Sequence, residues 1–444
     1  MIFLYKCQPN LIKPDKSLKA ILEFICSQSH KLTNCGIYYA RQIYFKTGKI
    51  IKKFDLINEY KNNKHYQVLH SQAAQQTLLS VFESFKSFKA LNSKYRKGEL
   101  QEQPRLPKYR KPPGLAAISY PKQALKLVEG QIQIPLGTTI NRWFNLKNFL
   151  LPISSNLNFD DIKELRIVPR NRCFYVEFVY QTSETQKQQV SPDRCLGIDT
   201  GIGNWLTCVS NVGTSFIIDG RHLKSVNQFY NKQIANIKQN KYQGFWSKRL
   251  AAITEKRNRR MRDAVNKAAR LVIDHCLKQG IGTLVFGWNK GQRQEVNLGT
   301  KTNQTFVQIP TAKVKNRISQ LCEQYGIEFV ETEESYTSKA SFLDHDFLPK
   351  YGDAARSWGF PPGVTAEPRS GEKPVTWKES GKRVKRGLYR TANNFYVNAD
   401  ANAAANILRK VKATLGLNLD GVYRGALTTP LRVRFWAASE SPCL

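Results

Sequence analysis

The spacing of apolar residues predicts a β-rich domain that is interrupted by helices. Residues 16–105 carry apolar side chains at helical spacing, and a proline-rich segment ends that pattern. From about 115 to 185 the pattern changes to that of strands, and two β-rich runs flank the polar turn Arg170–Asn171–Arg172, which predicts a hairpin. We therefore expect a β-rich domain of residues 1–15 and 106–190 around a helical insertion.

A second unit is predicted to begin near residue 191. Short buried-type strands are expected at 195–199, 205–210, 215–219, 281–287 and 327–332, and helices at 223–240, 247–279, 310–325 and 400–416. A meander of three strands followed by long helices is the way an RNase H-like sheet begins. We expect residues 191–342 and 391–416 to form this α/β domain. Residues 343–390 are rich in Pro, Gly and charge and predict an irregular insertion, and the tail 417–444 is weakly patterned.

Composition points to a polyanionic partner. The chain has 444 residues, with 69 Lys and Arg against 34 Asp and Glu, and a formal net charge of +35. Hydrophobic residues at 41% supply ordinary cores, so the charge does not indicate a disordered basic tail. Nucleic acid is the expected partner, since each phosphate contact releases counterions. The alternative is a basic structural protein such as a ribosomal component.

Membrane and secreted classes are not favoured. No apolar stretch approaches the ~20 residues of a membrane-spanning helix, and the N-terminal segment lacks the apolar region of a secretory signal. The nine cysteines are scattered without a CxxC pair. This pattern is typical of a reducing cytoplasm and argues against a zinc ribbon or a disulfide framework.

Two aspartates are the clearest candidates for chemistry. Asp199 ends an apolar strand beside a tight turn, and Asp400 stands at the start of a helix rich in alanine. A metal-dependent phosphoryl-transfer site needs hard oxygen ligands on rigid elements. Each residue has a simpler alternative, because Asp199 could be a turn residue and Asp400 an N-cap.

Three segments taken together resemble a known family. Gly197–Asp199, TSKASF at 337–342 and DANAAANI at 400–407 resemble the split RuvC motifs of the TnpB (OrfB) family, transposon-encoded RNA-guided nucleases related to compact type V CRISPR effectors. The basic segment 107–111 and the hairpin at 165–180 extend the resemblance to about residues 1–412.

The resemblance implies a fold, partners and a location. The expected fold is α+β and multidomain: a wedge-type β-barrel with a helical recognition insertion, followed by a RuvC-like nuclease domain. The implied partners are a guide RNA and target double-stranded DNA, with no membrane and no small-molecule substrate. The implied location is the prokaryotic cytoplasm, in association with the nucleoid.

In that family an Asp, Glu, Asp triad binds two Mg²⁺ ions, with Mn²⁺ as a substitute. Asp199 matches the first member and Asp400 the third, but Gly287 stands where the family has its Glu. Either the site is inactive, or another carboxylate replaces the Glu. We select Glu333, because strand alternation places it on the same face as Glu331 but nearer the carboxyl end of the strand, and keep Glu334 as the alternative.

Other acidic residues and a zinc site are less favoured. Glu295, Asp344 and Asp346 are weaker candidates for the third carboxylate. The family also carries a four-cysteine zinc ribbon, but residues 343–390 contain no cysteine and only one histidine, His345, so no zinc is expected.

Basic residues with neighbouring aromatics predict nucleic-acid contacts. Those in the segment after the helical insertion are Lys108, Tyr109, Arg110 and Lys111, and those on a predicted helix are Lys256, Arg257, Arg259, Arg260 and Arg262. Clustered charge suits a phosphate backbone, and the tyrosine suits stacking on unpaired bases.

The sequence therefore predicts an RNA-guided DNA endonuclease with catalytic and metal-binding residues Asp199, Glu333 and Asp400. The alternatives are a guided DNA-binding protein without cleavage and a small type V CRISPR effector. A cut-and-paste transposase of the Asp/Asp/Glu type would carry its Glu on a helix after the last strands, where this chain has Asp400 followed by NAAANI.

Overall fold

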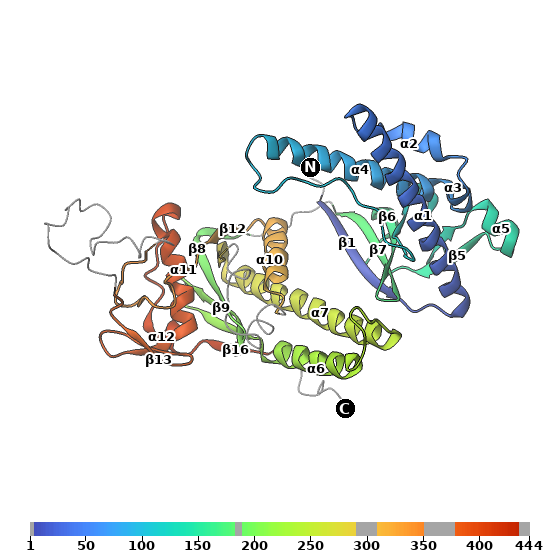
Figure 1. Ribbon diagram of the computed structural model, residues 1–444. Helices are drawn as coiled ribbons and strands as arrows, with labels where there is room; N and C mark the ends of the chain where they lie inside the picture. The colour runs from blue at the N-terminus through green and yellow to red at the C-terminus, as the bar shows by residue number, and fades with distance from the viewer. Residues whose placement is uncertain (1–3, 183–188, 290–308, 350–377, 435–444) are drawn as a thin grey trace. The chain divides into compact units, whose positions relative to one another are not determined.

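The structure is a computed structural model with a mixed α+β fold and several sheets (Figure 1). It describes residues 4–182, 189–289, 309–349 and 378–434. The chain divides into two compact units, Met1–Glu184 and Thr185–Leu444, and each is described by itself. In the described ranges no helix is long and apolar enough to cross a membrane.

The first unit begins with a strand and four helices, and the rest of it consists mainly of strands. Its elements are β1 (Leu4–Ile12), α1 (Lys16–Thr47), α2 (Lys53–Tyr60), α3 (Lys64–Val68), α4 (Ser71–Arg96), β2 (Ile118–Pro121), η1 (Lys122–Ala124), β3 (Lys126–Val128), β4 (Gln131–Pro135), α5 (Thr138–Phe144), β5 (Asn148–Pro152), η2 (Phe159–Asp161), β6 (Ile162–Arg170) and β7 (Cys173–Thr182). The helical pattern expected to residue 105 ends at Arg96.

Two antiparallel sheets and the helices share one apolar core. The sheets have the strand orders β1-β7-β6-β2 and β3-β4-β5. Leu22 and Ile25 of α1, Leu78 of α4 and Phe178 of β7 are fully buried in the common core. In the described part of this unit no strand pair joins the two sheets, so the closed barrel remains a prediction.

The hairpin predicted around residue 171 is confirmed. β6 and β7 pair antiparallel, with Arg170 opposite Cys173. Asn171 and Arg172 form the connection with φ values of +47° and +63°. Two successive residues with positive φ give the turn a twist that matches the right-handed twist of the strands.

The second unit alternates strands and helices. Its elements are β8 (Ser191–Thr200), β9 (Asn204–Ser210), β10 (Ser215–Asp219), α6 (Arg221–Lys238), α7 (Lys248–Gln279), β11 (Ile281–Gly287), α10 (Thr311–Tyr325), β12 (Glu328–Thr332), β13 (Lys382–Lys385), β14 (Leu388–Arg390), β15 (Tyr396–Asn398), α11 (Ala399–Leu415), α12 (Arg424–Thr428) and β16 (Leu431–Val433). The predicted bounds of the strands at 215–219 and 281–287 are confirmed.

Six of these strands form one sheet, in the order β12-β11-β8-β9-β10-β16. The meander β8-β9-β10 is antiparallel, as expected from the sequence. β11 runs parallel to β8, and β12 runs parallel to β11. β8, β11 and β12 therefore have their carboxyl ends on the same edge of the sheet, which brings the segments that follow them together.

Helices cover both faces of this sheet. Leu196 and Ile198 of β8 lie in the cluster formed with α7 and α10, whereas Cys195 of β8 lies in the cluster formed with α11. A Cβ at Gly197 would lie 2.5 Å from the carbonyl oxygen of Ala404. The backbones of β8 and α11 are therefore in direct contact, which the alanines of α11 permit.

Two segments are more ordered than the sequence indicates. Residues 382–390 lie within the expected irregular insertion but contribute β13 and β14, which pair with β15 in a three-stranded sheet. The weakly patterned tail contains α12, and its strand β16 joins the edge of the six-stranded sheet beside β10.

Candidate functional site

Asp199 and Asp400 meet a glutamate at the edge of the six-stranded sheet. Burial raises the pKa of the Asp199 carboxyl well above its ordinary value, and the neighbouring carboxylates of Glu334 and Asp400 raise it further. Asp199 lies near the end of β8, Glu334 follows β12, and Asp400 lies in the first turn of α11. We call these three residues the carboxylate cluster.

Asp400 is available for this cluster because another residue caps its helix. The side chain of Asn398 accepts hydrogen bonds from the backbone N–H groups of Asp400 and Ala401, both at 3.0 Å. Asn398 is therefore the N-cap of α11. The carboxylate of Asp400 instead accepts a hydrogen bond from Nδ2 of Asn204 at 2.6 Å and faces the guanidinium of Arg383 at 3.2 Å.

Glu334, and not Glu333, is the glutamate that faces Asp199. The carboxylate of Glu333 forms an ion pair with Lys410 of α11 and accepts a hydrogen bond from the N–H of Ser335. Partial burial opposes the shift, but these contacts lower the pKa of Glu333 below its ordinary value. Strand alternation does not extend to residue 333, because β12 ends at Thr332.

Gly287 leaves the space that Glu334 borders. A Cβ at Gly287 would lie 3.3 Å from Oε2 of Glu334 and 2.5 Å from Cδ1 of Ile407. Two residues later, Oδ1 of Asn289 accepts a hydrogen bond of 2.9 Å from the backbone N–H of Glu334. Gly287 therefore leaves room beside the Glu334 carboxylate, and Asn289 anchors the Glu334 backbone.

Asparagines of α11 fix the segment that follows Glu334. Asn402 accepts from the N–H of Phe342 and donates to the carbonyl of Ala340. Asn406 donates to the carbonyls of Thr337 and Ala340. The two segments of the sequence resemblance, 337–342 and 400–407, are thus joined by buried hydrogen bonds.

The weaker acidic candidates lie elsewhere. Asp344 accepts hydrogen bonds from Ser380 and from the backbone N–H of Ala392, and Asp346 accepts from the N–H groups of Ser341 and Ser380. Both aspartates accept hydrogen bonds from Ser380, just before the β13–β14 hairpin, and Asp344 also from Ala392, just after it. Glu295 lies outside the described residues.

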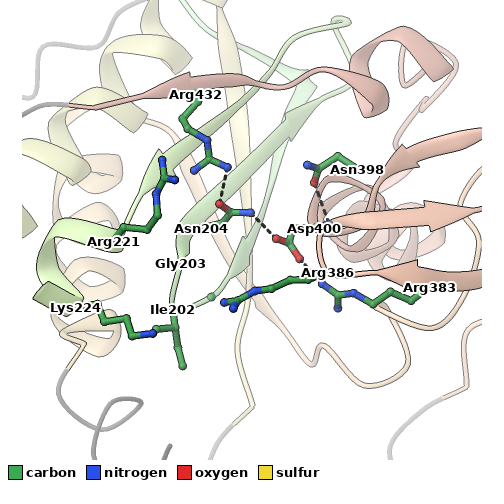
Figure 2. Close-up of a pocket in the computed structure, with 12 residues that line it drawn as sticks. Ile202, Gly203, Asn204, Arg221, Lys224, Arg383, Arg386, Asn398, Asp400 and Arg432 are labelled. Carbon is green, nitrogen blue, oxygen red and sulfur yellow. Dashed lines mark hydrogen bonds and ion pairs between the residues drawn. The ribbon is translucent and has the colours of Figure 1, made fainter. Parts of the chain in front are cut away.

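A basic pocket borders Asp400. The cavity has a volume of about 540 Å³ and five cationic side chains in its wall (Figure 2). These are Arg221, Lys224, Arg383, Arg386 and Arg432. The carboxylate of Asp400 lies in the same wall, so an anionic backbone in the pocket would lie beside the carboxylate cluster.

The cluster fits a hard divalent cation in its chemistry. Carboxylate oxygens are the ligands that Mg²⁺ prefers, and grouped carboxylates gain from a cation between them. In the part of the chain that the structure describes, no three His, Cys, Asp or Glu side chains are yet arranged to hold a metal ion. Arg383 pairs with Asp400 and partly offsets the rise in the pKa of Asp199, so a bound cation would take the place of its positive charge.

The predicted nucleic-acid residues fall into two groups. Lys108, Tyr109, Arg110 and Lys111 of the first unit are exposed, and the guanidinium of Arg41 lies 5.5 Å from the ring centroid of Tyr109. Lys256, Arg259 and Arg260 of α7 are also exposed.

Two arginines of α7 are held within the second unit. Arg257 donates a 2.8 Å hydrogen bond to Asn227 of α6, and burial lowers its pKa. Arg262 lies 3.6 Å from the buried carboxylate of Glu255. Arg257 therefore joins α7 to α6, whereas Arg262 pairs with a residue of its own helix.

Sequence reasoning missed several residues of the site. Asn204, Asn289, Arg383 and Arg432 contact members of the carboxylate cluster or each other. Asn204 follows directly after the glycine-containing turn that succeeds Asp199, and this position is the signal that could have identified it. Arg432 belongs to a strand of three residues, too short to give a pattern.

A comparison with protein families covers the first of the three motif segments, Gly197–Asp199. Residues 177–293 match a family model, OrfB_IS605, described as "Probable transposase". No curated protein matches the chain.

Solved structures of CRISPR effectors show a distant similarity. A Cas12f1–sgRNA–target DNA complex has a TM-score of 0.49 and 14% identity, covering 88% of this chain and 83% of that chain. A Cas12f ternary complex has a TM-score of 0.32 and 17% identity, covering 88% and 82%. CasPhi-2 (Cas12j) bound to crRNA has a TM-score of 0.37 and 10% identity, covering 95% and 99%. The family match, which spans β7 to β11, confirms the resemblance to the TnpB (OrfB) family that the sequence motifs predicted.

Proposed function

We propose that this chain is an RNA-guided DNA endonuclease whose cleavage site consists of Asp199, Glu334 and Asp400. The observation that carries the proposal is the convergence of these carboxylates, with Glu334 beside the space at Gly287. A carboxylate after β12 can reach the position served by a glutamate after β11, because the two strands are parallel neighbours. Glu334 therefore replaces the missing member of the triad.

The topology of the second unit supports a RuvC-like nuclease domain. A three-stranded antiparallel meander followed by two parallel strands beside its first strand is the arrangement of an RNase H-like sheet. The order β10-β9-β8-β11-β12 has these neighbours and directions. The resemblance to the TnpB family supplies the expectation of a guide RNA and of target DNA.

Asp199, Glu334 and Asp400 would hold the divalent ions, which we propose to be two Mg²⁺ as in the family. Bound there, the ions would activate a water and stabilise the leaving oxygen at a phosphodiester. Asn204 keeps one oxygen of Asp400 oriented. The cationic side chains of the basic pocket attract the phosphate backbone of the strand to be cut. Guide pairing selects the sequence, and the protein contacts shape and backbone.

Cleavage of a plasmid library in Mg²⁺, by the full chain purified with its co-expressed RNA, tests this proposal. Glu334→Gln removes one ligand charge at nearly constant volume and is expected to reduce cleavage by at least about 100-fold. Glu333→Gln is the matched control, because that carboxylate pairs with Lys410, and it should still cleave. Equal loss in both variants, or full cleavage by Glu334→Gln, would reject Glu334 as the third carboxylate.

A guided DNA-binding protein without cleavage is the second candidate. It is favoured by the glycine at position 287 and by the engagement of Asp400 with Asn204 and Arg383. It predicts that target DNA is bound but never cut, in Mg²⁺ or Mn²⁺, and that Asp199→Asn leaves binding unchanged.

A further inference from the structure

The last described strand brings a side chain to the basic pocket that borders Asp400. β16 lies parallel to β10, with Ile217 opposite Arg432. Val433 packs on the apolar cluster beneath α7. Alternation along the strand therefore directs Arg432 to the other face of the sheet, where it lines the pocket that contains Asp400 (Figure 2).

Arg432 is anchored by a buried carboxylate. Asp219, at the end of β10, is only 3% exposed. Its Oδ1 and Oδ2 both accept hydrogen bonds from Nε of Arg221, at 3.1 and 2.9 Å, and its Oδ2 lies 3.4 Å from Arg432. Burial alone would raise the pKa of Asp219, but the contacts with Arg221 and Arg432 lower it. Asp219 is therefore a fixed anion that holds the guanidinium of Arg432.

Arg432 in turn determines the orientation of an amide. It donates a hydrogen bond of 2.8 Å to Oδ1 of Asn204. A guanidinium can only donate, so the oxygen of the amide must face Arg432. Nδ2 of Asn204 is then the group that faces Asp400, and it donates to Oδ2 at 2.6 Å. The reversed amide would put its oxygen against the carboxylate and its NH₂ group against the guanidinium, which are two repulsive contacts.

We propose that Arg432 and Asn204 are positioning residues that hold Asp400 in the orientation needed for a divalent metal ion. This inference rests on the proposed function. Asp219, Arg432, Asn204 and Asp400 form the chain of contacts, which we call the relay. Figure 2 shows its part from Arg432 through Asn204 to Asp400. The relay holds Oδ2, while Oδ1 faces only Arg383 among the contacts described above, a charge that a metal ion can replace.

Binding of Mn²⁺ to the full chain without DNA, followed by electron paramagnetic resonance, tests the relay separately from cleavage. Loss of a residue that orients a metal ligand typically weakens metal binding 10- to 100-fold. Arg432→Ala and Asn204→Ala are each expected to weaken Mn²⁺ binding by about 10-fold or more. The double variant should lose no more than Asn204→Ala alone, because both changes break one pathway.

The chain offers a matched control for charge. Arg434 also lies near Asp219, at 3.7 Å, and is more exposed than Arg432. Arg434→Ala removes one positive charge near Asp219, as Arg432→Ala does, but leaves the contact between Arg432 and Asn204 in place. This variant should bind Mn²⁺ as the unchanged protein does. Arg432→Lys keeps the charge but cannot bridge two acceptors in the same way, so it should recover only part of the loss.

The outcomes separate the two proposals. If Arg432→Ala binds Mn²⁺ as tightly as the unchanged protein, or if Arg434→Ala loses as much, the relay is rejected while the nuclease proposal stands. If the unchanged protein binds no Mn²⁺, both are rejected. Thermal melting of each variant identifies loss of folding. If Arg432→Ala unfolds the edge of the sheet at β16, Asn204→Ala still tests the relay, because Asn204 lies on β9.

Discussion

Replacing Gly287 with alanine tests whether the missing side chain is required for the position of Glu334. The new Cβ would lie 2.5 Å from Cδ1 and 3.2 Å from Cγ1 of Ile407, and 3.3 Å from Oε2 of Glu334. Carbon atoms pack best at about 3.5–4.0 Å, and Ile407 is fully buried. Ile407 must move, and overpacking of this kind costs about 1–3 kcal/mol.

A second substitution makes this prediction quantitative. Ile407→Val removes Cδ1, the closest atom, and alone costs about 0.5–1.5 kcal/mol. In the double variant the collision is relieved, so its loss of stability should be smaller than the sum of the single losses, by about 1 kcal/mol. For a unit of this size, 1 kcal/mol corresponds to about 2–4 °C in the melting temperature.

Thermal unfolding and plasmid cleavage provide the measurements. Gly287→Ala is expected to melt at a lower temperature and to cleave more slowly, since the new methyl group also crowds the Glu334 carboxylate. Ile407→Val should recover part of both properties in the double variant. Additive losses of stability, together with unchanged cleavage by Gly287→Ala, would refute the link between the glycine and Glu334.

Three further results are expected. The raised pKa of Asp199 means that the folded state keeps this proton at pH values above the ordinary pKa of 3.8, so stability falls as the pH rises from 3.8 to the folded-state pKa. Asp199→Asn should therefore melt at a higher temperature than the unchanged protein at pH 7 in EDTA, but not at low pH. A lower melting temperature of the variant at pH 7 would contradict this. Mg²⁺ should raise the melting temperature of the unchanged protein and not that of Asp199→Asn, as thermal shift in both proteins would show. Joint replacement of Lys256, Arg259 and Arg260 by alanine should weaken nucleic-acid binding and reduce its salt dependence by about one unit of slope per lost phosphate contact. The control Arg257→Ala should mainly lower the melting temperature. Equal salt slopes for the triple variant and the unchanged protein would exclude phosphate contacts at these three residues.

Five of the six strands of this sheet, all except β16, were predictable because burial leaves a strong pattern. β10 and β11 have the bounds that their apolar runs predict, since each runs through the core between polar turns. The prediction that Asp199 and Asp400 lie together came from the family motifs, and the local pattern added only that a helix rich in small residues can pack closely against a sheet.

The third carboxylate could not be assigned in the same way. Glu333 and Glu334 are neighbours, and the choice between them depends on the residue at which β12 ends and on the contact of Glu333 with Lys410. That lysine lies 77 residues away in the sequence. Contacts over such separations depend on tertiary packing, which residue spacing does not encode. The same reason hid Arg432, whose strand pairs with β10 only in the folded sheet.

The relay has a consequence for the order in which the molecule assembles. Arg432 and Asn204 are separated by 228 residues, and Asn204 and Asp400 by 196. Closing loops of this length costs entropy before any contact compensates for it, so such pairings form late in folding. Synthesis also delivers Asn204 long before Arg432. We therefore expect a nascent chain to complete the first unit while the carboxylate cluster is still unoriented, so that the cluster takes its final arrangement only after β16 has paired with β10.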